Sequence, residues 1–177
     1  MSAQTAPLKT EEAAAEAERI ACLNSLQVCG TDPDERLDAL TCAAAEHFDV
    51  SIALITLIDV SQQWIKSNHG LPVRSTARSI AFCHYTIQRQ RLLIVENTLE
   101  DARFARNPLV TNAPHIRFYA GAPLLIGNRY RIGSFCLLHD IPRGFDLASR
   151  RKLWRFSQVA SQLIERLYGN GRESIPA

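Results

Sequence analysis

The first third of the chain carries apolar residues at helical spacing. Over 10–28 a narrow apolar stripe runs between glutamates, and it consists of Ala13, Ala17, Ile20 and Leu23. This spacing predicts an amphipathic helix, which Gly30 would end. For a second helix, Asp32 can serve as N-cap, Pro33 as the first helical residue and Glu35 as the partner in a capping box. We expect that helix to continue to about residue 48.

The middle of the chain has the apolar pattern of strands. Over 51–59, apolar residues occupy both odd and even positions, which is typical of a strand covered on both faces. Further strands are expected over 63–68, 92–95, 116–125 and 129–138. Gly127-Asn128 is a good tight-turn dipeptide, and it would make the last two strands antiparallel neighbours.

Two more helices and two loops complete the pattern. Residues 79–90 look like a short helix after a loop over 71–78, and 96–115 form a long loop with helical turns around Asp101–Ala105. A loop of that length inside a compact domain is usually functional. The longest helix is expected over 146–168, where the apolar stripe steps by three and four: Leu153, Phe156, Ala160, Leu163 and Leu167.

This order of elements predicts a fold of the α/β (α+β) class. We expect a mixed, largely antiparallel sheet of five to six strands, with the N- and C-terminal helices packed on one face. The single domain would cover 10–168, after a disordered leader over 1–9 and before a flexible tail over 169–177. Tight turns between neighbouring strands exclude a doubly wound nucleotide-binding fold.

Composition narrows the function classes. A length of 177 residues fits one domain, and a net charge of +2 is too small to indicate a nucleic-acid partner. No apolar run approaches the roughly 20 residues that cross a bilayer, and no signal sequence precedes the first helix, so we expect a cytoplasmic protein without a membrane partner. Five irregularly spaced cysteines and five scattered histidines predict free thiols and no metal site.

Several sequence blocks resemble GAF domains of bacterial signalling proteins, the type that precedes diguanylate cyclase or histidine kinase domains. In order across about 18–165 they are DPDERLDALTCAAAEHFDVSIALITLID, QWIKSNHGL, FC at 82–83, NPLVTNAPHIRFYAGAPL and GSFCLLHDIPR. The resemblance implies a sensory domain that folds around one pocket and works by binding rather than by catalysis. Tyr85 stands where the family's FCAHAI string has histidine, and the N-K-F-D-E pattern of cyclic-nucleotide-binding members is absent, which argues against a cyclic nucleotide.

A ligand pocket of this family would lie between the sheet and the loops, so one face of the strand over 116–125 should floor it. We therefore predict no resident cofactor but an unidentified small-molecule ligand. The candidate ligand-binding residues are Trp64, Lys66, Phe82, Cys83, His84, Arg103, Phe104, Asn107, Arg117, Tyr119 and Cys136. In the alternative, Phe104 and Tyr119 fill the space and Arg103 faces water or an aspartate.

Cys83 and Cys136 carry the alternative of an enzyme. Cys83 falls near the start of a helix and close to Arg78, and both features lower a thiol pKa. The pair would then be the catalytic residues of a thiol enzyme similar to free methionine-sulfoxide reductase. The simpler interpretation is that both cysteines fill core space. Cys83-His84 resembles a bilin anchor only superficially, because that pair lies later in bilin-binding GAF domains.

The terminal helices predict the partners. A helix over 146–168 would be about 34 Å long at roughly 1.5 Å per residue, which exceeds what short strands need. We therefore expect a homodimer through the terminal helices and a separate output protein that receives the signal. The alternatives are that these helices only cover the sheet, and that the domain is a ligand-free scaffold for protein contacts.

Overall fold

A computed structural model describes residues 5–169 of the chain, with side chains from Thr10 onward. The elements in chain order are α1 (Thr5–Ser25), α2 (Glu35–Phe48), β1 (Ile52–Ile58), β2 (Gln62–His69), β3 (Ser75–Ala77), the 3-10 helix η1 (Arg78–Ile80), α3 (Phe82–Ile87), β4 (Leu93–Val95), α4 (Pro108–Thr111), β5 (Phe118–Ile126), β6 (Tyr130–His139) and α5 (Leu147–Tyr168). Among these residues, none of the helices is both long and apolar enough to span a bilayer.

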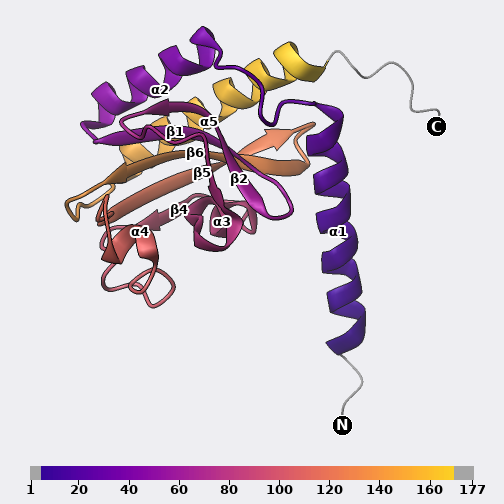
Figure 1. Cartoon of the computed structure of the whole chain (residues 1–177), viewed down its shortest axis with the longest axis horizontal. Coiled ribbons are helices and arrows are strands. Elements are labelled where there is room, and N and C mark those ends of the chain that lie inside the picture. Colours follow the sequence, from indigo (N-terminus) through magenta and orange to yellow (C-terminus); the bar gives the residue numbers. More distant parts are fainter. Residues whose placement is uncertain (1–4, 170–177) are drawn as a thin grey trace.

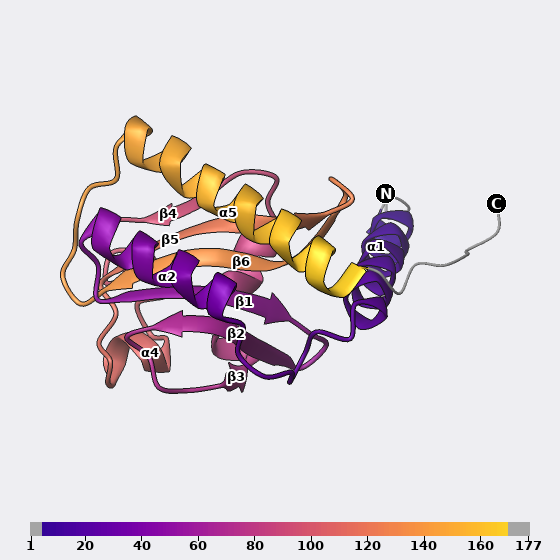
Figure 2. The same cartoon turned by 90° about the horizontal axis from the view of Figure 1, so that it is seen from above.

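The six strands form one sheet in the order β3-β2-β1-β6-β5-β4, in which every neighbouring pair is antiparallel (Figure 2). The expected fold class, α+β with a largely antiparallel sheet of five to six strands, is confirmed. The β5–β6 hairpin turns where the sequence predicted it, because Gly127 and Asn128 both adopt the positive φ that a tight hairpin turn requires.

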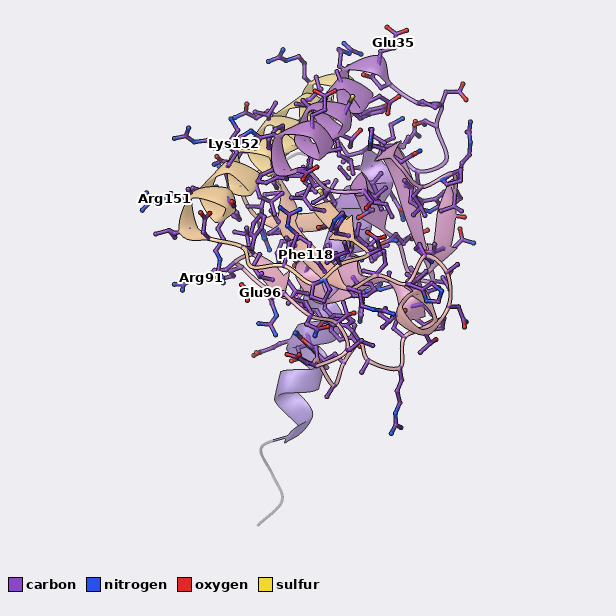
Figure 3. The ribbon with its side chains drawn as sticks, turned by 90° about the vertical axis from the view of Figure 1, so that its left-hand side faces the viewer. Glu35, Arg91, Glu96, Phe118, Arg151 and Lys152 are labelled. Atoms are coloured by element: carbon purple, nitrogen blue, oxygen red, sulfur yellow. The ribbon has the colours of Figure 1, made fainter. Side chains whose placement is uncertain are left out.

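Two long helices, α2 and α5, lie side by side over one face of the sheet (Figures 1 and 2). Asp146 begins α5 by accepting a hydrogen bond from the Ser149 backbone N–H at 2.7 Å. Leu153 and Ala160 of the predicted stripe are fully buried against the sheet, in the same core as Phe135. The stripe of α5 therefore packs within its own domain. Figure 3 views the domain from the left-hand side of Figure 1 and shows Arg151 of α5, and Arg91 just before β4, projecting outward.

The other face of the sheet is covered by short elements, α3, α4 and the turns between β4 and β5 (Figure 1). Its buried residues form a second core that includes Ile58, Phe82, Phe104 and Tyr119. Successive residues of β5 face opposite ways, so Tyr119 belongs to this second core and Phe118 to the first. The sheet thus separates two layers of different construction.

Helix α1 stands away from the sheet and meets the body of the domain only with its last turns (Figure 1). Cys22 and Leu23 are buried in the first core, whereas the side chains over 10–18 are exposed apart from the half-buried Glu16. Arg19 holds this helix to the sheet, because its Nη1 donates to the Ile58 carbonyl oxygen at 2.7 Å.

Several predicted boundaries were wrong. The N-cap of α2 is Asp34, whose side chain accepts from the Arg36 backbone N–H at 3.0 Å, so Asp32 and Pro33 precede the helix. α1 ends at Ser25 rather than 28, and Gln27 adopts a positive φ after it. α1 also begins at Thr5, inside the predicted leader; residues 1–4 and the predicted tail over 170–177 lie outside the described residues.

Two further differences concern the second face. The loop expected over 71–78 contains β3, a three-residue strand too short to leave a sequence pattern, which pairs with the edge of β2. The helix expected over 79–90 is divided into η1 and α3 at Ala81, which has an extended backbone. These differences matter because β3, η1 and α3 all border the candidate site.

Candidate functional site

Two buried thiols from distant parts of the chain meet at the centre of the second face. Cys83 lies in the first turn of α3 and Cys136 on β6, and their Sγ atoms are 3.5 Å apart. Their exposed fractions are 2% and 0%. The two elements meet because α3 packs directly across β6 and β5. The two cysteines that the sequence offered as a catalytic pair therefore lie next to each other.

Two polar side chains, Tyr119 of β5 and Thr86 of α3, form a hydrogen-bonded row that ends at Cys83. The Tyr119 hydroxyl donates to Cys83 Sγ at 3.4 Å and lies 2.6 Å from Thr86 Oγ1. Gly121 makes room for this arrangement, since a Cβ there would lie 2.2 Å from the Tyr119 hydroxyl. The Tyr119 ring can thus lie along β5, with its hydroxyl in contact with the buried Cys83 sulfur.

Burial and hydrogen bonding shift the pKa values of the Cys83 and Cys136 thiols in opposite directions. Burial raises the pKa of the Cys83 thiol, but hydrogen bonds with Cys136, Thr56 and Tyr119 outweigh burial and lower that pKa to about 7. Burial raises the pKa of Cys136 well above its usual value, and the neighbouring Cys83 raises it further. Cys83 is therefore the thiol that ionises first, and its thiolate would accept hydrogen bonds from these neighbours.

A cavity of about 200 Å³ adjoins the two thiols. It lies between the sheet, α3 and two loop segments, and its lining is mostly apolar: Leu54, Gln63, Leu71, Val73, Thr76, Phe82, Cys83, Leu109, Ala113, Pro114, Tyr119, Cys136 and Leu138. Val73 is 39% exposed, so the cavity reaches the surface at that residue.

One polar group of the cavity lining has no partner. Gln63 Nε2 donates to Thr76 Oγ1 at 3.1 Å, whereas Gln63 Oε1 is buried without a hydrogen bond to any described residue. A buried carbonyl oxygen without a partner costs roughly 1–3 kcal/mol. Gln63 therefore offers an acceptor to any donor that enters the cavity.

Aromatic rings fill the rest of this layer. Phe82 stacks on Phe104 at a centroid distance of 4.4 Å and on Tyr119 at 5.1 Å, and Tyr85 meets Phe104 edge-on at 5.0 Å. The alternative in which Phe104 and Tyr119 occupy interior space therefore holds for this part of the layer. The cavity is the space that remains beside the stack.

The structure brings only some of the predicted ligand-binding residues together. Phe82, Cys83, Tyr119 and Cys136 line the cavity. Phe104 lies behind Phe82 and has no exposed surface. These five come from α3, β5, β6 and the turns before α4, as the expected pocket between sheet and loops requires.

Four other predicted residues lie outside the cavity because each is engaged elsewhere. Arg103 forms an ion pair with Asp101, as the alternative anticipated. Arg117 Nη1 donates to the Val110 carbonyl oxygen at 2.9 Å. Asn107 begins α4 by accepting from the Leu109 backbone N–H, and its Nδ2 donates to the backbone of η1.

His84 is the fourth of these residues, and it faces η1. Its Nδ1 accepts a hydrogen bond from Arg78 Nε at 3.1 Å. Burial lowers the pKa of His84, and the positive charge of Arg78 lowers it further. A neutral imidazole at this position is consistent with its role as an acceptor.

Trp64 and Lys66 lie on the opposite face of the sheet from the cavity. They line a separate hollow of about 210 Å³ beneath the α1–α2 connection. Lys66 Nζ donates to Thr31 Oγ1 at 2.6 Å and to the Asp32 carbonyl oxygen at 2.5 Å, and it lies 5.0 Å from the centre of the Tyr168 ring. The prediction that these two residues wall the pocket was wrong, because Trp64 packs on the first core.

Gln63, Thr76 and the aliphatic residues that line the cavity were not among the predicted ligand-binding residues. Strand parity could have identified Gln63, since it alternates with Trp64 and so faces the other side of the sheet. Thr76 carried no comparable signal because β3 was not predicted. Within residues 10–169, no group of three His, Cys, Asp or Glu side chains is arranged to hold a metal ion.

Comparison with known proteins gives the family. The GAF domain family matches residues 32–166. A cyclic di-GMP phosphodiesterase of Pseudomonas aeruginosa is 37% identical over 126 residues, which are 71% of this chain and 22% of that protein. The chain thus spans about a fifth of the length of this curated relative.

Solved structures show the same fold at low sequence identity. The GAF domain of an Acinetobacter phosphoenolpyruvate-protein phosphotransferase has a TM-score of 0.64 at 18% identity, covering 90% of this chain and 98% of that one. Free methionine-R-sulfoxide reductase from Neisseria meningitidis has a TM-score of 0.63 at 13% identity, covering 82% and 87%. With the family match over three quarters of its length, the chain belongs to the GAF domain family.

Proposed function

We propose that this GAF domain is a regulatory module that binds a small, largely apolar molecule in the cavity beside Cys83 and Cys136. The observation that carries the proposal is the cavity itself, about 200 Å³ and mostly apolar. An apolar cavity of about 150 Å³ binds benzene, whereas sites for drug-sized ligands measure roughly 300–1,000 Å³. The ligand would therefore be about the size of a single ring, and a nucleotide would not fit.

The relatives support a regulatory role. The similar region makes up only 22% of a protein named as a cyclic di-GMP phosphodiesterase, so most of that relative lies outside it. In our proposal, ligand occupancy in this chain alters the activity of a partner protein in the cytoplasm. The terminal helices would carry the signal, and the exposed part of α1 would contribute to a homodimer.

A cavity-filling variant tests ligand binding. Leu109 lines the cavity, whereas Leu99 is 52% exposed and does not. With benzene as the probe, NMR titration should shift the methyl signals of Leu54 and Leu138 saturably in the native protein and in Leu99→Phe. Leu109→Phe should lose the response while retaining its circular dichroism spectrum. If Leu109→Phe misfolds, Leu71→Phe fills the same cavity. Absence of a response in the native protein, or an equal response in the folded cavity variant, would refute the proposal.

The dimer has its own test. Static light scattering of the full chain at high micromolar concentration should give twice the monomer mass. α1 is the element to perturb, because its side chains over 10–18 are exposed except at Glu16. A monomer at that concentration would remove the dimer from the proposal and leave ligand binding untouched.

A second candidate function is reduction of a small sulfoxide, and the cysteine pair favours it. Two thiols can reduce methionine-R-sulfoxide: its oxygen leaves as water and the thiols become a disulfide. The Cys83 and Cys136 sulfurs are 3.5 Å apart. Turnover of free methionine-R-sulfoxide with a dithiol reductant should then disappear in Cys83→Ser and in Cys136→Ser, and persist in Cys42→Ser. No turnover by the native protein would exclude this candidate.

A further inference from the structure

We propose that Cys83 and Cys136 become a reversible disulfide when a small organic hydroperoxide enters the cavity, and that the accompanying shift of α3 is passed to α1. This inference rests on the proposed function, because the oxidant must enter the same cavity. It adds the chemical class of the ligand, the covalent change at the site and the path by which the rest of the domain detects it.

The geometry leaves the thiols one short movement away from a bond. Their sulfurs are 3.5 Å apart, against about 2.05 Å in a disulfide. Cys136 is fixed in β6, which pairs with strands on both sides. Cys83 belongs to α3, a helix of six residues. Closing the bond should therefore move α3 toward the sheet rather than distort the sheet.

The other cysteines do not compete for this site. Cys42 is exposed on α2, and Cys22 and Cys29 pack with the first core, on the opposite side of the sheet. Burial raises the pKa of Cys29 to about 11, so little of that thiol forms the reactive thiolate at neutral pH. Among the cysteines in the described part of the chain, only Cys83 and Cys136 adjoin the cavity.

The reaction balances with a hydroperoxide as the oxidant. The Cys83 thiolate attacks one peroxide oxygen, the O–O bond breaks, and the other oxygen leaves with a proton as an alcohol, which gives a sulfenic acid on Cys83. The Cys136 thiol then attacks the Cys83 sulfur and releases the sulfenic oxygen as water. In sum, two thiols and one hydroperoxide give a disulfide, an alcohol and water, and an external dithiol reverses the change.

The cavity suits such an oxidant. Its mostly apolar lining favours an organic group over a charged one, and Gln63 Oε1 is an unpaired acceptor for the O–H of a hydroperoxide. Tyr119 donates to Cys83 Sγ, and it can donate equally to an oxyanion that leaves beside that sulfur. The lowered pKa of Cys83 makes it the attacking sulfur, and the raised pKa of Cys136 makes it the second to react.

A row of hydrogen bonds connects the cysteine pair to α1. His84 follows Cys83 in α3 and accepts from Arg78 Nε at 3.1 Å. Arg78 Nη1 donates to Glu16 Oε1 at 2.7 Å, and Glu16 lies on α1. A shift of α3 toward β6 would carry His84 away from Arg78. This row would lengthen, and α1 would lose one of its holds on the domain.

The disulfide is tested on the full chain with tert-butyl hydroperoxide, followed by alkylation of free thiols and peptide mapping. The native protein and Cys42→Ser should gain a Cys83–Cys136 disulfide, which dithiothreitol reverses. Cys136→Ser should stop at a sulfenic acid on Cys83 that dimedone traps, and Cys83→Ser should form neither product. Intermolecular disulfides alone, or oxidation only after unfolding, would contradict the inference.

The path to α1 is tested by hydrogen exchange. Oxidation should raise amide exchange across 14–21 of α1 in the native protein. Arg78→Met should form the disulfide and lack that response, whereas Arg129→Met, which removes the exposed ion pair with Glu18, should keep it. An α1 that does not respond in the oxidised native protein would overturn this part. Benzene binding without disulfide formation would refute the inference while leaving the proposed function standing, whereas failure of both would remove both.

Discussion

The two faces of the sheet are built in different ways. Under α5, buried hydroxyls bond to backbone carbonyl oxygens: Ser157 donates to Pro123 and Ser161 donates to Ser157. Under α3 and α4, side chains bond to one another, from Thr86 through Tyr119 to Cys83. Hydrogen bonds to backbone carbonyl oxygens strengthen a layer whose position is already fixed. Hydrogen bonds between side chains make the position of each side chain depend on its neighbours.

The covering elements differ in the same sense. α2 and α5 have 14 and 22 residues, whereas α3 and α4 have six and four. A long helix buries a continuous face and moves as a unit, whereas a single turn can shift at the cost of few contacts. We infer that the first face supplies most of the stability and that the second face can change its packing around a cavity. The experiments below test this division.

The largest expected effect is on the first face. Phe135 has no exposed surface and packs against Phe156 at a centroid distance of 5.5 Å. Phe135→Ala should lower the free energy of unfolding by about 3–5 kcal/mol, measured by urea denaturation. Val159→Ala on the exposed side of α5 is the control. A loss below that of any second-face variant would break the comparison.

An intermediate effect is expected from crowding the second face. A Cβ on Gly121 would lie 2.2 Å from the Tyr119 hydroxyl and 2.7 Å from Thr86 Oγ1. Gly121→Ala should therefore cost about 1–3 kcal/mol of unfolding free energy. Tyr119→Phe removes the hydroxyl and should recover part of the loss, as a double-mutant cycle would measure. Gly144→Ala, which has open space around it, should be neutral, and additivity of the first two changes would contradict this account.

A smaller effect is expected at the start of α5. Asp146 accepts from the Ser149 backbone N–H at 2.7 Å, so Asp146→Ala should lower the unfolding free energy by about 1 kcal/mol. Asp146→Asn retains the acceptor and should recover most of the loss. The variant should leave benzene binding unchanged, since α5 covers the face opposite the cavity. An altered benzene affinity would mean that the two faces are coupled.

The smallest effect is a pH dependence at α1. Hydrogen bonds with Arg19 lower the pKa of Glu16, burial opposes them, and Arg78 lowers it further, to about 2. A lowered pKa in the folded state adds stability above the ordinary carboxyl pKa and loses it as pH falls toward 2. Glu16 is 39% exposed, so the contribution should be about 1 kcal/mol or less. Glu16→Gln should flatten the unfolding free energy between about pH 4.5 and pH 2; an unchanged slope would contradict the assignment.

Sequence reasoning predicted the sheet because its signals are local. Apolar residues at both parities of β1 and the Gly127-Asn128 turn specify strands and a hairpin without knowledge of the rest. The cap of α2 was misplaced by two residues, since Asp32 and Asp34 have the same chemistry and only the folded backbone decides between them. β3 was missed because three residues carry no period.

The site was only partly predictable because it depends on contacts between distant segments. Cys83 and Cys136 were identified by thiol chemistry and by the position of Cys83 near a helix start, and they do meet. Arg103 and Arg117 were expected at the cavity, but local partners, an aspartate two residues away and nearby carbonyl oxygens, engage them first. Trp64 and Lys66 were assigned to the wrong face because the sequence does not say which side of a two-sided strand holds the cavity.

Lys66 has a mechanical consequence. Its ammonium group joins Thr31 and Asp32, which connect α1 to α2, and it also lies against the ring of Tyr168 in the last turn of α5. A pulling force applied to the end of α5 would therefore load the α1–α2 connection as well as the sheet. In a single-molecule stretching experiment, Lys66→Met should let the last turn of α5 detach at lower force, before the sheet opens.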